Sequence, residues 1–263
     1  MPTLTVGPAT SEHPHGQQLD YRLEPGPPGD ARPPLVFLHE GLGSVELWRT
    51  FPDQVRAAAG GPTTLVYSRA GYGRSSPRQR PWPVSYMHRE ALDVLPEVLA
   101  RLGLERPVLI GHSDGGSIAV LYAGSGHPVA GLVLLAPHVF VEDVSVAGIA
   151  AAGAAYPSTG LRERLARYHD DADGVFWGWN DVWLSAAFRD WNIEDVLPGI
   201  EAPVLAVQGE GDEYGTLAQL DAIEAGVRGP FERLVVPGGG HVLYAGDASA
   251  LVAAVARFVR SLR

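Results

Sequence analysis

A serine lies between glycines where the chain passes from an apolar run into a helix-like segment. The apolar run is residues 107–110, the sequence GHSDGG follows at 111–116, and the helix-like segment covers 117–123. A serine hydroxyl is a poor nucleophile unless it is exposed beside a base, and a sharp strand-to-helix turn presents it in that way. Glycines are needed there because side chains would clash. We therefore predict that Ser113 is the nucleophile of an acyl-transfer reaction.

Such a serine needs a histidine as base and a carboxylate that orients the histidine, on loops after later strands in the order serine, acid, histidine. The apolar run at 202–207 is followed by Asp212, and Glu213 and Glu210 in the same loop are the alternatives. The run at 233–237 is followed by three glycines and His241. We predict His241 as the base and Asp212 as its partner.

Acyl transfer also needs hydrogen-bond donors for the oxyanion of the tetrahedral intermediate. The residue after the nucleophile supplies one backbone N–H at the start of a helix, which assigns Asp114. The second donor is expected from the glycine-containing loop at 39–44, where we favour Leu42 and then Gly41. This chemistry needs no cofactor and no metal. His13 and His15 have a proline between them and no third ligand nearby, so we expect no metal site there.

Short apolar runs alternate with helix-like segments along the chain, which predicts a mostly parallel sheet covered by helices. The runs lack the alternation of half-buried strands, as is typical of strands buried on both faces. They are residues 35–38, 64–67, 108–110, 131–135, 204–207 and 233–236. The helix-like segments are residues 45–59, 87–102, 117–123, 217–225 and 248–262. Residues 4–6 and 18–23 look like an antiparallel pair that extends one edge of the sheet.

The alternation stops from about residue 139 to 198, a segment with four of the six tryptophans, at 177, 179, 183 and 191. We interpret 139–198 as a helical lid between two parts of one core domain, 1–138 and 199–263. Aromatic side chains over a hydrolytic site suit an apolar acyl group. We expect Trp177 and Trp183 to contact the substrate, together with Glu40 and Gly41.

With these motifs, nearly the whole chain resembles the α/β-hydrolase superfamily, and within it the lidded esterase, lactonase and carbon–carbon hydrolase group. The loop at 67–75 looks like the Gly-X-Gly-X-Ser loop of that family. Two positions depart from the pattern: Glu40 stands between His39 and Gly41, and Asp114 follows the nucleophile, where the family usually has an uncharged or aromatic residue. Counting from Gly111 puts Ser113 at the nucleophile position, which argues against the aspartate-based halide or epoxide chemistry of related enzymes.

The sequence allows two interpretations of Asp114. A carboxylate at a helix start is favoured by the helix dipole by about 0.3–1 kcal/mol, which by itself explains the residue. Alternatively, Asp114 and Glu40 together make the pocket acidic, which favours neutral or cationic acyl groups over anionic ones. His39 and His112 flank the site and are expected to be hydrogen-bonded scaffold residues, because His241 already fills the role of base.

Charge and composition restrict the partners. The formal net charge of −10, from 20 Lys+Arg against 30 Asp+Glu, argues against nucleic acid or an anionic membrane surface as the main partner. The chain has no cysteine, which excludes a thiol nucleophile and disulfides. The N-terminus lacks a basic start and an apolar run, so we expect a cytoplasmic protein. Separately, we expect a monomer or small homo-oligomer.

The predicted function is hydrolysis of a carboxylic ester or similar acyl bond of a small molecule, neutral or cationic with an apolar part. Hydrolysis of a carbon–carbon bond or an enol-lactone in a catabolic pathway is the alternative within the same chemistry. A small-molecule receptor that keeps a hydrolase fold is the alternative outside enzymes.

Overall fold

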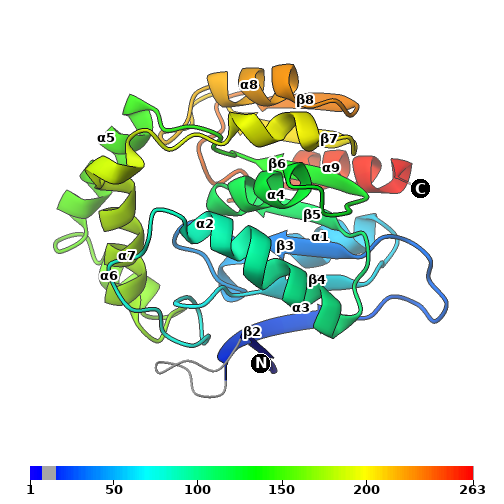
Figure 1. Cartoon of the computed structure of the whole chain (residues 1–263), viewed down its shortest axis with the longest axis horizontal. Coiled ribbons are helices and arrows are strands. Elements are labelled where there is room, and N and C mark those ends of the chain that lie inside the picture. Colours follow the sequence, from blue (N-terminus) through cyan, green and yellow to red (C-terminus); the bar gives the residue numbers. More distant parts are fainter. Residues whose placement is uncertain (8–15, 263) are drawn as a thin grey trace.

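The protein is built on one eight-stranded sheet with the order β1-β2-β4-β3-β5-β6-β7-β8 (Figure 1). The computed structural model describes residues 1–7 and 16–262, so His13 and His15 lie outside the described residues. The strands are β1 (Thr3–Val6), β2 (Gln17–Glu24), β3 (Leu35–Leu38), β4 (Thr64–Tyr67), β5 (Val108–His112), β6 (Gly131–Leu135), β7 (Val204–Gly209) and β8 (Phe231–Val236). β2 is antiparallel to β1 and β4, and the strands from β4 to β8 pair in parallel.

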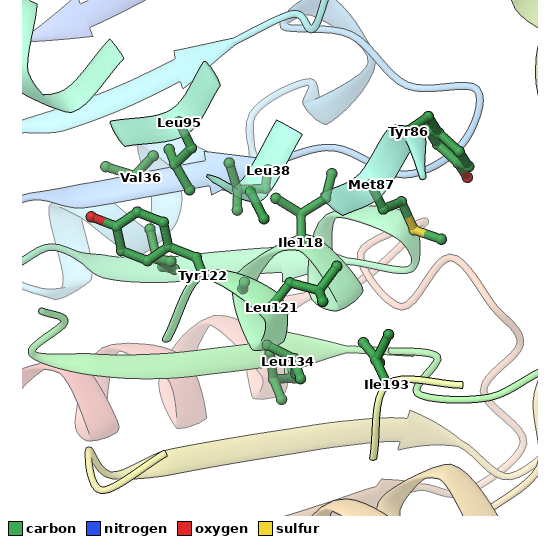
Figure 2. Packing of buried hydrophobic residues seen from close by; sticks show 14 of the residues in the cluster. Val36, Leu38, Tyr86, Met87, Leu95, Ile118, Leu121, Tyr122, Leu134 and Ile193 are labelled. Atoms are coloured by element: carbon green, nitrogen blue, oxygen red, sulfur yellow. The ribbon is translucent and has the colours of Figure 1, made fainter. Parts of the chain in front are cut away.

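The central strands β3 to β7 are buried along their whole length, because helices cover both faces of the sheet. One face carries α1 (Phe51–Ala58) and α9 (Ser249–Ser261). The other carries α2 (Tyr86–Arg89), α3 (Leu95–Leu102), α4 (Asp114–Gly124) and α8 (Ala218–Gly226). Figure 2 shows side chains of this second layer, with Ile118 and Leu121 of α4 packed between Leu38 and Leu134 of the sheet. This burial on both faces explains the continuous apolar runs in the sequence.

Two of the predicted helices are interrupted. Residues 45–59 form a 3₁₀ turn η1 (Glu46–Trp48) and then α1, because Arg49 between them has φ 51°. Residues 87–102 form α2, a π-helical turn η2 (Glu90–Val94) and α3. Pro96 stands in the first turn of α3 and has no N–H for an α-helical hydrogen bond to the preceding turn. Local hydrogen bonding therefore set these boundaries, while the apolar pattern located the helices.

The segment between β6 and β7 is helical. It contains α5 (Asp143–Ala155), α6 (Leu161–Leu165), α7 (Ala172–Leu184) and the 3₁₀ turns η3 (Ala186–Phe188) and η4 (Glu194–Gly199). The bridge between Phe140 and Asn192 joins the two ends of this segment at the sheet. In Figure 1, α5, α6 and α7 lie together at one side of the sheet. Among the described residues, no helix combines the length and the hydropathy of a membrane span.

Candidate active site

Ser113 stands in a strained turn between β5 and α4. β5 ends at His112 and α4 begins at Asp114, and the Ser113 backbone between them has φ 52° and ψ −117°. Such a backbone costs an L-residue on the order of 1–3 kcal/mol. It is held by a hydrogen bond from the Ser113 N–H to the Leu135 carbonyl (2.9 Å) and by one from the Ser117 N–H to the Ser113 carbonyl (3.0 Å). These contacts fix the turn from which Ser113 reaches the pocket.

Glycines flank Ser113 because the turn packs tightly against itself and against β3. A Cβ on Gly111 would lie 2.2 Å from the carbonyl oxygen of Gly115, and a Cβ on Gly115 would lie 1.9 Å from the carbonyl oxygen of Leu38. Both distances are far below van der Waals contact and involve backbone atoms, which cannot move aside cheaply. The Gly-X-Ser-X-Gly spacing in the sequence is therefore a steric requirement of this turn.

His241 and Asp212 come together from the loops after β8 and β7. The His241 Nδ1 lies 2.9 Å from each carboxylate oxygen of Asp212. Asp212 also accepts hydrogen bonds from the Tyr214 N–H (2.8 Å) and the Gln208 side-chain amide (2.6 Å). A carboxylate at Nδ1 fixes the proton of a neutral imidazole on that nitrogen and leaves Nε2 free to accept one.

The Asp212 carboxylate is ionised at neutral pH although its side chain is only 1% exposed. Burial by itself would raise its pKa. The hydrogen bond to His241, the charge of that imidazole and the Tyr214 N–H together hold the pKa below the ordinary value. The imidazole therefore faces a permanent negative charge.

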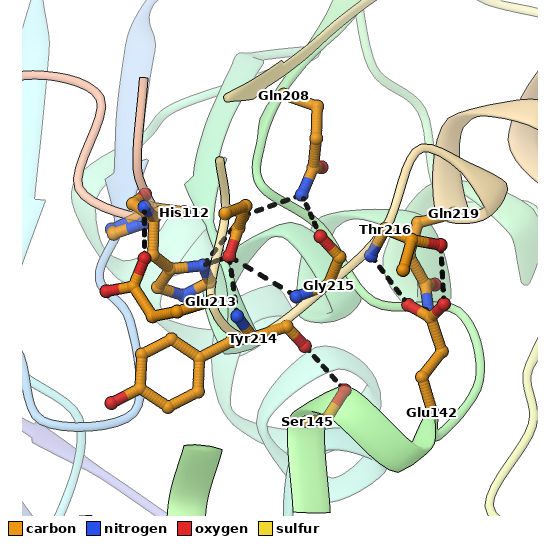
Figure 3. Close-up of polar contacts among 11 residues, drawn as sticks. His112, Glu142, Ser145, Gln208, Glu213, Tyr214, Gly215, Thr216 and Gln219 are labelled. Atoms are coloured by element: carbon orange, nitrogen blue, oxygen red, sulfur yellow. Dashed lines mark hydrogen bonds and ion pairs between the residues drawn. The ribbon is translucent and has the colours of Figure 1, made fainter. Parts of the chain in front are cut away.

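The alternative carboxylates in the same loop have other contacts, and Figure 3 shows those of Glu213. Glu213 accepts a hydrogen bond from the backbone N–H of His241 at 3.1 Å. Glu210 accepts one from the N–H of Gly238 at 3.3 Å. Of the three carboxylates, Asp212 is the one in contact with the His241 ring, and Glu213 holds the loop that carries it.

Ser113 and His241 open onto one pocket with a volume of about 200 Å³. Its polar walls are Glu40, Ser113, His138, Ser145, Glu213 and His241. Its apolar walls are Leu42, Ile149, Trp179, Trp183, Tyr214 and Val242, and Gly41 completes the lining. The helices α5 and α7 thus form one side of the pocket, and no lysine or arginine is among the described residues that line it.

The structure places one of the two tryptophans predicted to contact the substrate in the pocket. Trp183 lines the pocket, but Trp177 is not among the described lining residues and packs on Tyr156 and Phe176 instead. Trp179 takes the place expected for Trp177, and a Cβ on Gly41 would lie 2.3 Å from its indole nitrogen. The reason is the helical period: residues 179 and 183 are four apart and share a face of α7, whereas 177 is two residues from 179 and points elsewhere.

The loop after β3 forms a tight turn under the pocket. The Gly43 N–H donates to the Glu40 carbonyl at 3.1 Å, so Gly41 and Leu42 are its central residues. The His169 Nε2–H donates to the Leu42 carbonyl at 2.9 Å. The buried guanidinium of Arg69 donates to the Glu40 carbonyl at 3.1 Å. These contacts fix the turn from which the second oxyanion donor is expected.

Asp114 does not make the pocket acidic. Its side chain is fully buried, accepts a hydrogen bond from the Tyr86 hydroxyl (2.6 Å), and lies 3.7 Å from the Arg69 guanidinium. It is not among the described residues that line the pocket. Burial raises the pKa of Asp114, while Arg69 and Tyr86 act against that rise. The structure therefore does not support the interpretation in which Asp114 makes the pocket acidic, because its side chain lies beside a buried cation.

Glu40 does line the pocket. Burial raises the pKa of its carboxyl to about 7, and the positive charges of Arg69 and His241 oppose this. A Cβ on Gly43 would lie 1.7 Å from a Glu40 carboxylate oxygen, so the glycine leaves room for that group. Glu40 is therefore the residue that carries a titratable carboxyl in the turn beside Ser113.

His39 and His112 have scaffold contacts, as expected. The His39 Nδ1–H donates to the Glu40 carbonyl (2.8 Å), and its Nε2 accepts from the Arg69 N–H (3.1 Å). The His112 Nε2 bonds the His241 carbonyl at 3.0 Å and so supports the loop of the base.

Sequence reasoning missed Arg69, His169 and His138. His138 follows β6 and lines the pocket. The sequence did contain a signal for His138. It comes just after an apolar run, and the end of that strand lies at the same sheet edge as Ser113.

Comparisons with known proteins agree with this architecture. Residues 35–255 match the model of the alpha/beta hydrolase family. Proline iminopeptidase of Lactobacillus delbrueckii subsp. lactis is 34% identical over 91 residues, which are 35% of this chain and 31% of that protein. The chain thus spans about a third of the length of this curated relative.

Solved structures share the fold at low sequence identity. The enol-lactonase from Burkholderia xenovorans LB400 has a TM-score of 0.73 and 20% identity, over 98% of this chain and 99% of that one. The esterase from Exiguobacterium antarcticum has a TM-score of 0.72 and 19% identity, over 93% of this chain and 96% of that one. The family match covers most of the chain, and the sheet order and the strained serine turn agree with it. The chain belongs to the alpha/beta hydrolase family.

Proposed function

We propose that this hydrolase cleaves a carboxylic ester or similar acyl bond of a small molecule through an acyl-enzyme on Ser113. The observation that carries the proposal is that Ser113, in its strained turn, shares a pocket with His241, whose Nδ1 contacts Asp212. A nucleophile, a base and an orienting carboxylate are the set that acyl transfer by serine requires.

In the proposed reaction, His241 accepts the Ser113 proton as the hydroxyl attacks the carbonyl carbon. The Asp114 N–H, at the start of α4, and the Leu42 N–H, or Gly41 in its place, stabilise the oxyanion. His241 then donates its proton to the leaving alcohol, and water hydrolyses the acyl-enzyme by the same steps. Asp212 stays ionised and stabilises the imidazolium without taking its proton.

The substrate is proposed to be neutral or cationic with an apolar part. The pocket carries the carboxyl groups of Glu40 and Glu213, and aromatic rings form much of its wall. No lysine or arginine is among the described lining residues, so an anionic acyl group would lack a positively charged partner in the pocket. Residues 139–198 are proposed to act as the lid, since α5 and α7 supply one side of this pocket.

Hydrolysis of an enol-lactone is the second candidate, with a carbon–carbon bond as the other target for the same residues. A pocket of about 200 Å³ suits a small cyclic ester, and one structural neighbour is titled an enol-lactonase. Turnover of an enol-lactone or a vinylogous diketone in preference to p-nitrophenyl butyrate would favour this candidate.

The test compares wild type with Ser113→Ala for hydrolysis of p-nitrophenyl acetate and butyrate and for labelling by a fluorophosphonate probe. Ser158→Ala, at an exposed serine, is the matched control. Wild type and the control are expected to be active and labelled, and Ser113→Ala to be neither. A wild type that neither turns over esters nor reacts with the probe would refute the proposal and favour a small-molecule receptor.

A further inference from the structure

His138 lines the pocket but has no role in the proposed reaction. It follows β6 and is only 2% exposed. Its ring centre lies 5.8 Å from that of His241 and 5.2 Å from that of Trp183, whose plane it meets at 69°. A second imidazole therefore stands beside the proposed base and lines the same pocket as Ser113.

The backbone of His138 is held firmly, which fixes where its ring points. The His138 carbonyl accepts a hydrogen bond from the Ser117 hydroxyl at 2.6 Å. The N–H of the next residue, Val139, donates to the Gln219 side chain at 2.7 Å. Both contacts are buried, and Trp183 packs against the ring. The ring is therefore preorganised without help from a ligand.

The His138 ring, unlike the scaffold histidines, has no hydrogen-bond partner in the part of the chain that the structure describes. His39, His112 and His169 each bond through both ring nitrogens. The Nδ1 of His138 is buried and without a partner within residues 1–7 and 16–262. No hydrogen bond within the described residues therefore ties this ring into the scaffold, although His138 belongs to the pocket lining.

The His138 ring is uncharged and carries a single proton. Burial lowers the pKa of His138 to about 3, and the nearby charge of His241 acts in the same direction. The ring is therefore neutral at physiological pH and has one N–H. Nδ1 is the buried nitrogen of this ring, and the Gly215 backbone packs near it, since a Cβ on Gly215 would lie 3.5 Å from Nδ1. Because His138 lines the pocket while its Nδ1 is buried, we assign Nε2 to the pocket side.

We propose that His138 is a substrate-binding residue, whose Nε2–H donates a hydrogen bond to an oxygen in the acyl chain of the substrate. The preferred acyl groups then carry an ether, keto or hydroxyl oxygen a few bonds from the scissile carbonyl. This inference rests on the proposed ester hydrolysis and names the acyl groups that it favours. A site built to donate to an oxygen discriminates against a methylene in its place, because the buried donor is then left unpaired.

The test uses two p-nitrophenyl esters that differ by one atom. Methoxyacetate has an ether oxygen where butyrate has a methylene, and the leaving group is the same. Each kcat/KM is divided by the rate of hydroxide hydrolysis without enzyme, which removes the greater intrinsic reactivity of the methoxy ester. Wild type is expected to prefer methoxyacetate over butyrate about three- to tenfold on this corrected scale, the range that one neutral hydrogen bond supplies.

Three variants separate binding from structure. His138→Phe keeps a planar ring without a donor and is expected to bring the corrected ratio to about one. His138→Gln keeps a donor near Nε2 and should retain part of the preference, which also guards against misfolding of the phenylalanine variant. His127→Gln makes the same substitution at a histidine that stacks on Tyr122, away from the pocket, and should keep the wild-type ratio.

The outcomes distinguish this inference from the proposed function. An active, probe-labelled wild type with a corrected ratio of one or less would overturn the role of His138 and leave ester hydrolysis standing. The role of His138 would also be overturned, with ester hydrolysis left standing, if His138→Phe lowers kcat/KM for both esters by the same factor. An inactive, unlabelled wild type would overturn the proposed function itself.

Discussion

Replacing Glu40 by glutamine is expected to stabilise the protein at alkaline pH and hardly at all in acid. The carboxyl of Glu40 lies in the turn below the pocket, and burial raises its pKa from 4.5 to about 7. Glutamine has nearly the same size and no charge, so Glu40→Gln removes the titration and keeps the packing.

The sign follows from the protons bound in each state. Well below pH 4.5 the carboxyl is protonated in both the folded and the unfolded chain, so its burial carries no ionisation cost. Between pH 4.5 and about 7 the unfolded chain loses the proton while the folded protein keeps it, so stability falls as the pH rises. Above pH 7 both states are ionised, and the folded state bears the full cost of a buried charge.

The size of the effect follows from the pKa difference. At about 1.4 kcal/mol per pKa unit, a rise from 4.5 to about 7 corresponds to about 3 kcal/mol. Because Glu40 opens onto the pocket and is not fully buried, water screens part of this cost, and we expect roughly 2–3 kcal/mol. At pH 5 most of the cost is absent, and the variant should differ from wild type by less than about 1 kcal/mol.

The assay is urea unfolding of wild type and Glu40→Gln at pH 5 and pH 8, at one ionic strength. Glu105→Gln, at an exposed glutamate, controls for the loss of one surface charge. The free energy of unfolding of Glu40→Gln should exceed that of wild type at pH 8 and approach it at pH 5. A difference that is the same at both pH values would show that Glu40 is not held neutral by burial, and the reasoning would be wrong.

Three further substitutions test the site. Gly115→Ala places a Cβ 1.9 Å from a β3 carbonyl oxygen and should lower the free energy of unfolding by more than about 3 kcal/mol. Gly211→Ala, where the nearest atom to the new Cβ is at 3.4 Å, is the control and should change the free energy of unfolding by less than about 1 kcal/mol. Thermal unfolding measures both variants. Asp212→Asn should keep the fold and lower kcat for p-nitrophenyl butyrate by about 10⁴; a loss below tenfold would contradict the orienting role. Asp114→Asn removes the negative charge 3.7 Å from the buried Arg69 guanidinium and should destabilise by about 3–5 kcal/mol in urea unfolding. Because this carboxylate is not among the described pocket residues, the preference between cationic and anionic esters should not change, and a clear change would place its charge in the pocket after all.

Much of the fold could be predicted because its signals are local. An apolar run of four to six residues that ends in glycine or proline indicates a buried strand wherever it stands, and the predicted run 64–67 coincides with β4. The positions after such runs meet at one edge of a parallel sheet. The sequence could therefore place Ser113, Asp212 and His241 near one another without knowing any distance between them.

Helix boundaries were less predictable, because a single backbone conformation decides them. Arg49 adopts a positive φ that divides the predicted helix at 45–59, and nothing in the apolar period signals it. Pro96 did give a signal for the π turn before α3, since a proline cannot donate its hydrogen bond within a helix.

The sequence by itself determined the fold class, the serine turn and the candidate acid and base, because residue type and spacing along the chain suffice for them. Only the tertiary structure decided the direction in which side chains point. It turned Asp114 toward Arg69, put Trp179 rather than Trp177 over Gly41, and left the His138 ring in the pocket without a partner among the described residues. The physical reason is that these directions depend on neighbours from distant segments, whose approach is fixed only when the sheet and its helices pack together.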